Sequence, residues 1–243
     1  MKTSIERMVF MARVADQAQR YNDMLEYLTQ LIDTKDSDLN SDERNLLSVG
    51  FKNYISSART AWRTIQAIGK SEKYAKYGSD WFRYKLKVLK DLETRWKTVI
   101  DIIKDKLLPK SNEIEARAFY LKMIGDYYRY IAENARGDAL VEASDNAIEY
   151  YTQADIVARD LKPFHVTKLS LALNFSVFYY EVKDDLIKAC TLAKEALHYA
   201  MLQIDSMNDE DAKDALPLVA LLKENLSLWK EEVEDEEASA TAL

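Results

Sequence analysis

The stretch FYLKMIGDYYRYIAE, residues 119–133, places aromatic, apolar and charged side chains at the spacing of an α-helix. At about 100° per residue, its charged side chains fall on one narrow stripe. These are Lys122, Asp126, Arg129 and Glu133. The opposite arc carries Tyr120, Leu121, Ile124, Tyr127, Tyr128 and Ile131. The stretch therefore predicts a helix with one buried face. Its charged face is either a salt-bridged, solvated surface or part of a binding site.

The rest of the 243-residue chain also favours long helices. It is 48% hydrophobic and 31% charged, and it has only five glycines and three prolines to make turns. Pro109 and Pro163 mark two helix ends, because proline cannot continue the helix before it. We expect an all-α fold of nine antiparallel helices. The expected ranges are 3–18, 21–33, 41–69, 76–108, 112–136, 139–160, 166–182, 186–205 and 213–230. In the last of these, Asp214 is expected to cap the helix and Pro217 to lie in its first turn.

We expect one helical domain over residues 1–230, with halves at about 1–108 and 112–230, and a disordered acidic tail at 231–243. No apolar run reaches the ~20 residues that span a bilayer, and charged residues interrupt the N-terminal region, so no signal peptide is expected. The only cysteine, Cys190, fits a reducing cytoplasm, and the nucleus is a second compatible compartment. The net charge of -7 argues against nucleic acid or membranes as partners.

The chain offers no recognisable catalytic machinery. His165, His198 and Cys190 do not have the spacing of a zinc site. The five glycines are scattered, so no glycine-rich loop can hold a nucleotide. No nucleophile motif is present either. We therefore expect a protein that is not an enzyme and that uses neither a cofactor nor a metal.

The expected helix 41–69 carries a long segment without acids. No carboxylate occurs between Glu43 and Glu72. Lys52, Arg59 and Arg63 share one face of this helix. A separate apolar arc is formed by Leu47, Phe51, Tyr54, Ala58, Trp62 and Ile65. The stacked cations are either neutralised by carboxylates of another helix or form a site for an anion.

The two polar stripes together suit a phosphate. If they face each other, Lys52, Arg59 and Arg129 converge, and the Tyr130 phenol adds a fourth donor. A guanidinium offers two parallel donors to phosphate oxygens, and a lysine adds a point charge. In this arrangement Asp126 and Glu133 orient the arginines. The residues therefore indicate a site for a phosphorylated side chain.

Two further expected helices could hold the peptide around such a phosphate. The first places Leu173, Val177, Asn174 and Glu181 near one another, and the second does the same for Leu218, Leu221, Leu222, Asn225 and Trp229. Ordinary core packing explains most of these leucines. An asparagine amide, in contrast, can both donate to and accept from an extended peptide backbone.

Four blocks in this order, RNLLSV (44–49), FYLKMIGDYYRYIAE, LALNFSVFYYE (171–181) and LLKENLSLW (221–229), resemble the 14-3-3 proteins. The resemblance covers about residues 15–229. It implies a cup-shaped dimer of nine-helix subunits that binds phosphoserine or phosphothreonine peptides of client proteins, as an adaptor in signalling. The partner in the dimer would be a second copy or a sister isoform.

The resemblance also assigns site residues. It implies a phosphate pocket at Lys52, Arg59, Arg129 and Tyr130, with Arg63, Lys122, Asp126 and Glu133 as its neighbours. It implies backbone clamps at Asn174 and Asn225, with Glu181 and Trp229 nearby. The implied apolar wall comprises Leu173, Val177, Leu218, Leu221 and Leu222. The implied dimer contacts are Arg20, Asp23, Tyr84, Lys87 and Asp91, with Arg20–Asp91 and Asp23–Lys87 as pairs between subunits.

Some positions depart from the family. Ala61 stands where some members carry a regulatory serine, and Ser170, Val166 and Pro217 replace a usual glycine, proline and apolar residue. The stretch YAKYGSDWFRY (74–84) also diverges. The alternative function is a helical scaffold of the same fold that binds partners without phosphate. The intact set of three cations argues against it.

Overall fold

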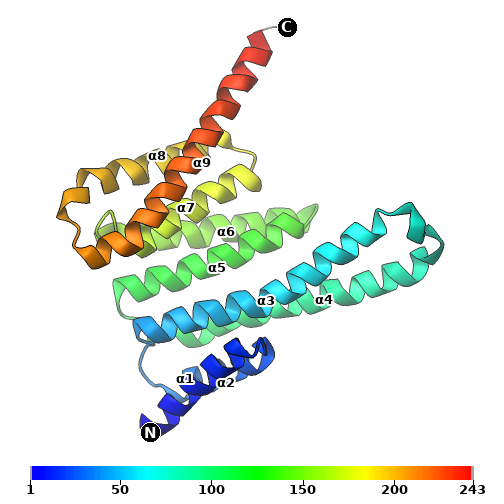
Figure 1. Ribbon diagram of the computed structural model, residues 1–243, viewed down its shortest axis with the longest axis horizontal. Coiled ribbons are helices and arrows are strands. Elements are labelled where there is room, and N and C mark those ends of the chain that lie inside the picture. The colour runs from blue at the N-terminus through cyan, green and yellow to red at the C-terminus, as the bar shows by residue number, and fades with distance from the viewer. Residues whose placement is uncertain (1, 242–243) are drawn as a thin grey trace. The chain divides into compact units, whose positions relative to one another are not determined.

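The computed structural model describes the backbone of residues 2–241, and within that range every long element is a helix and no strand occurs. Nine α-helices follow one another (Figure 1). They are α1 (Lys2–Gln17), α2 (Tyr21–Thr34), α3 (Ser41–Gly69), α4 (Gly78–Ile102), α5 (Ile114–Asn134), α6 (Asp138–Val157), α7 (Val166–Glu181), α8 (Leu186–Leu202) and α9 (Asp209–Thr241). The predicted all-α fold with nine helices is confirmed.

The start of α3 shows how local sequence fixes a helix boundary. The Asn40 side chain accepts a hydrogen bond from the Glu43 backbone amide at 2.9 Å, and the Glu43 carboxylate accepts one from the Asn40 amide, also at 2.9 Å. This capping box satisfies two amides that the helix itself leaves unpaired. An N-cap of this kind stabilises a helix by about 1 kcal/mol.

The chain divides into two compact units, one that ends at Asn112 and one that begins at Glu113. In the first, α1 packs on α2 and α3 packs on α4. Leu47, Phe51, Ala58 and Trp62 of the predicted apolar arc are buried there, whereas Tyr54 and Ile65 are half-buried. In the second, α5 packs mainly on α6, and α7 packs on α8 and α9.

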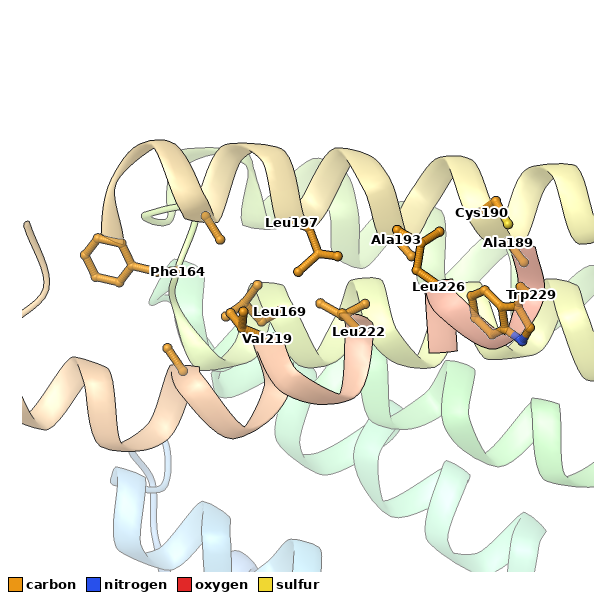
Figure 2. Packing of buried hydrophobic residues seen from close by; sticks show 12 residues of the cluster. Phe164, Leu169, Ala189, Cys190, Ala193, Leu197, Val219, Leu222, Leu226 and Trp229 are labelled. Carbon is orange, nitrogen blue, oxygen red and sulfur yellow. The ribbon is translucent and has the colours of Figure 1, made fainter. Parts of the chain in front are cut away.

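A hydrophobic cluster joins the last three helices of the second unit (Figure 2). Leu169 of α7 and Ala193 and Leu197 of α8 meet Leu222 and Trp229 of α9 there, all of them buried. The thiol of Cys190 lies in the same cluster. This packing fixes the faces that α7 and α9 leave for other contacts.

Both ends of α9 differ from the prediction. The Asn208 side chain accepts from the Asp211 amide at 2.7 Å, so α9 begins at Asp209 and Pro217 lies inside the helix. The prediction that Asp214 caps this helix and that Pro217 lies in its first turn was wrong. The helix also continues through Thr241, where we expected a disordered tail. The segment 231–241 is rich in Glu and Ala, which are good helix formers. The end of that expected tail, residues 242–243, lies outside the described residues.

Between α4 and α5 the helical geometry changes twice. A π-helical turn covers Ile103–Leu107 and a 3-10 turn covers Leu108–Lys110, so the chain leaves the α conformation before Pro109. The side chains of Ile103 and Leu107 are both buried.

Among the helices described, none is both long and apolar enough to cross a membrane.

Candidate functional site

The carboxylate of Asp126 is the meeting point of three helices in the second unit. The Lys122 ammonium, one turn earlier on α5, lies 2.8 Å from its Oδ2. The phenol of Tyr151 on α6 and the amide of Asn174 on α7 both donate to its Oδ1, each at 2.8 Å. Asp126 itself is buried, and Tyr151 is fully buried. A buried carboxylate is stable only when its oxygens are satisfied in this way.

Arg129 lies one turn further along α5 and is only 8% exposed. Its Nη1 donates to Glu133 at 2.7 Å and lies 3.7 Å from the Glu181 carboxylate of α7. The guanidinium is centred 4.4 Å from the centroid of the Tyr130 ring. Its Nε is buried and finds no hydrogen-bond partner among the described residues. The protein thus fixes one edge of the guanidinium and leaves a donor unused.

The surroundings keep Arg129 ionised. Burial on its own would lower the pKa of the guanidinium, but nearby oxygens outweigh it and raise the pKa above its ordinary value. These oxygens belong to Tyr151, Asp126, Tyr130 and Glu133. Burial, followed by the charge of Asp126, raises the pKa of both Tyr127 and Tyr151 well above the usual phenol range. The site is therefore one buried cation among carboxylates and neutral phenols.

This geometry corrects one interpretation of the charged stripe on α5. A solvated face is wrong for Asp126 and Arg129, because side chains from α6 and α7 cover them. The prediction that Glu133 orients the arginine is consistent with the contact at 2.7 Å. Asp126 instead holds Lys122, Tyr151 and Asn174. Sequence reasoning missed Tyr151, because nothing in its neighbourhood on α6 indicates a partner 25 residues away.

The cations of α3 lie in the first unit. Lys52 and Arg63 are exposed, and neither forms an ion pair with any described residue. Arg59 is half-buried and has an interaction partner. Within the first unit, Lys52 and Arg63 therefore have no described carboxylate that neutralises them.

The predicted wall on α7 and α9 separates into core and surface. Leu222 and Trp229 are buried in the cluster of Figure 2, so these two side chains support a surface rather than form one. Leu221 is 45% exposed, and Asn225 is half-buried. Leu173, Val177 and Leu218 are partly buried against the same cluster.

Trp229 also links the ends of α7 and α9. Its ring lies 5.2 Å from the Tyr180 ring, centroid to centroid, and the Tyr180 hydroxyl donates to Glu232 at 2.9 Å. That hydrogen bond, with some burial, raises the pKa of the Tyr180 phenol. Glu181, the next residue, is exposed and reaches toward Arg129. Trp229 was predicted to lie near the peptide. The contacts that it makes within this chain are structural, with the cluster and with Tyr180.

The predicted dimer residues are exposed or half-buried in the first unit, and three of them form ion pairs within the chain. Arg20 contacts Asp23, and Arg95 donates to Asp91 at 3.0 Å. Tyr84 and Lys87 on α4 are exposed. Large apolar side chains are exposed on the same helix and on α1. They are Phe10, Val14, Phe82 and Leu86. Apolar side chains of this size are available to an interface.

Comparisons with known proteins agree with the sequence blocks. Residues 11–230 match the model of the family described as 14-3-3 protein. The 14-3-3-like protein B of Glycine max is 40% identical over 95% of this chain and 96% of its own length. The 14-3-3 protein 3 of Entamoeba histolytica is 40% identical over 98% and 100%, and 14-3-3 protein 7 of Solanum lycopersicum is 39% identical over 97% and 94%. The chain belongs to the 14-3-3 family of phosphopeptide-binding adaptor proteins.

Proposed function

We propose that Lys52, Arg59, Arg129 and Tyr130 bind the phosphate of a phosphoserine or phosphothreonine client. The adaptor function itself follows from the family, whose members act as dimers on phosphorylated clients and are not enzymes. The observation that carries the residue assignment is the state of Arg129. Its charge is secured, and Glu133 fixes the orientation of the guanidinium.

The exposed cations of α3 supply the solvent-accessible part of the site. Lys52 has no carboxylate partner among the described residues, so an incoming phosphate need not break an existing ion pair with it. Each hydrogen bond to a charged group contributes about 1.5–3 kcal/mol before desolvation is subtracted. Arg63 and Lys122 act as neighbours that raise the local positive charge.

The peptide on either side of the phosphate is held by amides and apolar side chains. We propose Asn174 and Asn225 as backbone clamps. The Nδ2 of Asn174 is already bound to Asp126, which leaves its Oδ1 to accept from a peptide amide. Leu173, Val177 and Leu221 provide apolar contacts. Leu218 and Glu181 flank them, and the buried Leu222 and Trp229 support α9 from behind.

For the dimer we propose Arg20–Asp91 and Asp23–Lys87 as pairs between subunits, with Tyr84 beside them. Forming the first pair exchanges existing contacts of Arg20 with Asp23 and of Asp91 with Arg95. Ion pairs between exposed side chains are screened by water and contribute little, so exchanging them changes little. Burial of Phe10, Val14 and Phe82 then supplies most of the free energy of association.

We also propose a cytoplasmic location, which a single buried thiol fits.

The test is fluorescence anisotropy with a labelled Arg-Ser-x-pSer-x-Pro peptide and its unphosphorylated form. Lys52→Glu removes an exposed cation and should leave the fold unchanged while weakening binding at least 100-fold. Arg129→Lys keeps the charge but loses the planar pair of donors, and should weaken binding at least tenfold. Lys194→Glu on α8 makes the same charge change at an exposed position outside the site, and serves as the matched control.

Two results would contradict the proposal. Equal binding of the phosphorylated and unphosphorylated peptides by the folded dimer would favour the scaffold that needs no phosphate. An equal loss of affinity in Lys52→Glu and Lys194→Glu would show that overall charge, and not a site, attracts the peptide.

A further inference from the structure

A cavity of about 350 Å3 lies in the second unit, bounded by α6, α7 and α8. α7 lies between the other two helices (Figure 1) and forms its floor with Leu169, Leu171, Ala172 and Phe175. Leu192 and Ala196 of α8 form one side, and Pro163, from the loop before α7, contributes too. Sites for small molecules typically have volumes of about 300–1,000 Å3 and apolar walls with a few polar groups. The cavity has the dimensions of such a site.

This cavity is separate from the proposed peptide-binding residues. On α7 it uses Ala172 and Phe175, whereas the proposed site uses Asn174 and Val177. At 3.6 residues per turn, these two pairs lie on roughly opposite sides of the helix. Asn174 turns toward Asp126 of α5, which is not part of the cavity. A ligand in the cavity therefore occupies a different face of the protein from a phosphopeptide.

The charged groups around the cavity favour a cation. The carboxylates of Asp155 on α6 and Glu195 on α8 both line it and are exposed, and neither has a hydrogen-bond or ion-pair partner in the described part of the chain. Lys168 also lines it, but its ammonium donates to the backbone carbonyls of Arg159 at 3.1 Å and Leu161 at 3.3 Å. Its charge is thus directed to carbonyl groups that follow the end of α6, and such carbonyl groups favour a cation. Two unpaired carboxylates remain for a ligand.

An aromatic ring completes the opening. Tyr199 lines the cavity and is 58% exposed. A cation within about 6 Å of such a ring is attracted by its π electrons. The floor is shielded from solvent, in contrast to Tyr199, since the side chains of Leu171 and Phe175 are buried. The cavity therefore combines exposed polar groups with buried apolar ones, as an amphiphilic ligand requires.

We propose that this cavity binds a small amphiphilic amine, whose apolar body rests on Leu171 and Phe175 and whose ammonium pairs with Asp155 and Glu195. The ligand class follows from the apolar floor and from the two carboxylates without partners. Neither the phosphate site nor the dimer contacts enter this argument, so the proposal does not depend on them.

The probe is 4-phenylbutylamine, compared with 4-phenylbutanol and 4-phenylbutyrate, which carry the same apolar body with a neutral and an anionic head. Binding to the full chain is followed by calorimetry and by methyl NMR shifts of Leu171, Leu192 and Ala196. For a ligand of this size we expect a Kd on the order of 1 mM for the amine. The alcohol should bind at least tenfold more weakly, and the anion should not bind measurably.

Two variants locate the site. Asp155→Asn with Glu195→Gln should reduce the tenfold preference for the amine over the alcohol to less than threefold, because it removes the charge but keeps the cavity. Ala196→Trp should abolish binding of both by filling the space. The matched control makes the same two charge changes at Glu142 and Asp145, exposed positions on α6 outside the cavity. It should keep the full preference.

Several results would overturn the proposal. Equal affinity for the amine, the alcohol and the anion would show that charge is not recognised. Full amine binding by Ala196→Trp would place the ligand elsewhere, as would NMR shifts outside the three helices. Phosphopeptide binding, measured separately in the same variants, should stay within twofold of the wild type. A larger loss of phosphopeptide binding in these variants would contradict the separation of the two sites, whereas the cavity proposal is decided by the amine preference alone.

Discussion

Replacing Tyr151 with phenylalanine isolates the hydrogen bond that α6 contributes to the buried carboxylate. The change removes one oxygen, 2.8 Å from Asp126 Oδ1, and leaves the ring in place against Phe175, whose centroid is 4.9 Å away. No large cavity opens, so the main loss is a hydrogen bond to a charged group. Asp126 keeps Lys122 and Asn174 as partners. The free energy of unfolding should therefore fall by about 2 kcal/mol, within the range of about 1.5–3 for such bonds.

Urea denaturation followed by circular dichroism measures this change directly. In a thermal scan of a chain of this size, 1 kcal/mol corresponds to about 2–4 °C in Tm, so the Tm should fall by about 4–8 °C. Tyr199→Phe is the matched control, because it deletes the same atom from an exposed ring, and its unfolding free energy should stay within about 0.5 kcal/mol of the wild type. If Tyr151→Phe matches that control, the Asp126 hydrogen bond does not stabilise the fold and the reasoning is refuted.

Three further changes probe the packing of the second unit. Leu222→Ala should lower the unfolding free energy by about 2–5 kcal/mol, because Leu222 is buried. Leu221→Ala should leave it within about 0.5 kcal/mol of the wild type and weaken phosphopeptide binding, because Leu221 is exposed. The opposite outcome would show that Leu221 is the core residue and Leu222 the surface residue. Gly125→Ala places a Cβ 2.7 Å from the Tyr151 ring, so overpacking of about 1–3 kcal/mol should exceed a helix gain of about 1 kcal/mol; equal or greater stability in urea would contradict this. Burial raises the pKa of Tyr127 and Tyr151 in the folded state, so both phenols resist ionisation there. The free energy of unfolding should therefore be constant below pH ~10, the usual phenol pKa, and should fall as the pH rises above it. Urea titrations at pH 8–11.5 should show a shallower fall in the Tyr151→Phe variant.

The sequence was sufficient for features that depend on neighbours along the chain. The expected start of α3 at residue 41 agrees with the structure, because Asn40 and Glu43 form a cap within four residues. The start of α9 was missed for a related reason. Asn208 is followed by a run of acids, which favour the first turn of a helix. The prediction instead placed the start of the helix at residue 213, so that Pro217 would lie in the first turn.

Features that depend on contacts between helices could not be read from the pattern. Periodicity placed Asp126 and Arg129 on one stripe of α5, but the choice between solvent and burial depends on what α6 and α7 bring against it. Leu221 and Leu222 are adjacent in sequence and equally apolar, yet only Leu222 is in the core. Which cations bind phosphate was suggested by charge pattern and by family resemblance, and it remains a proposal.

The π turn at Ile103–Leu107 bears on how this chain can change length during evolution. A π turn closes its hydrogen bonds over five residues instead of four, so it holds one residue more than the α turn it replaces. Deleting one residue there can restore an α turn, and inserting one can create a π turn, while the helices on either side keep their own hydrogen bonds. Because the turn stands where α4 ends, a change of one residue alters the junction with α5 first. Natural variation in length can accumulate at this junction without rebuilding either helix.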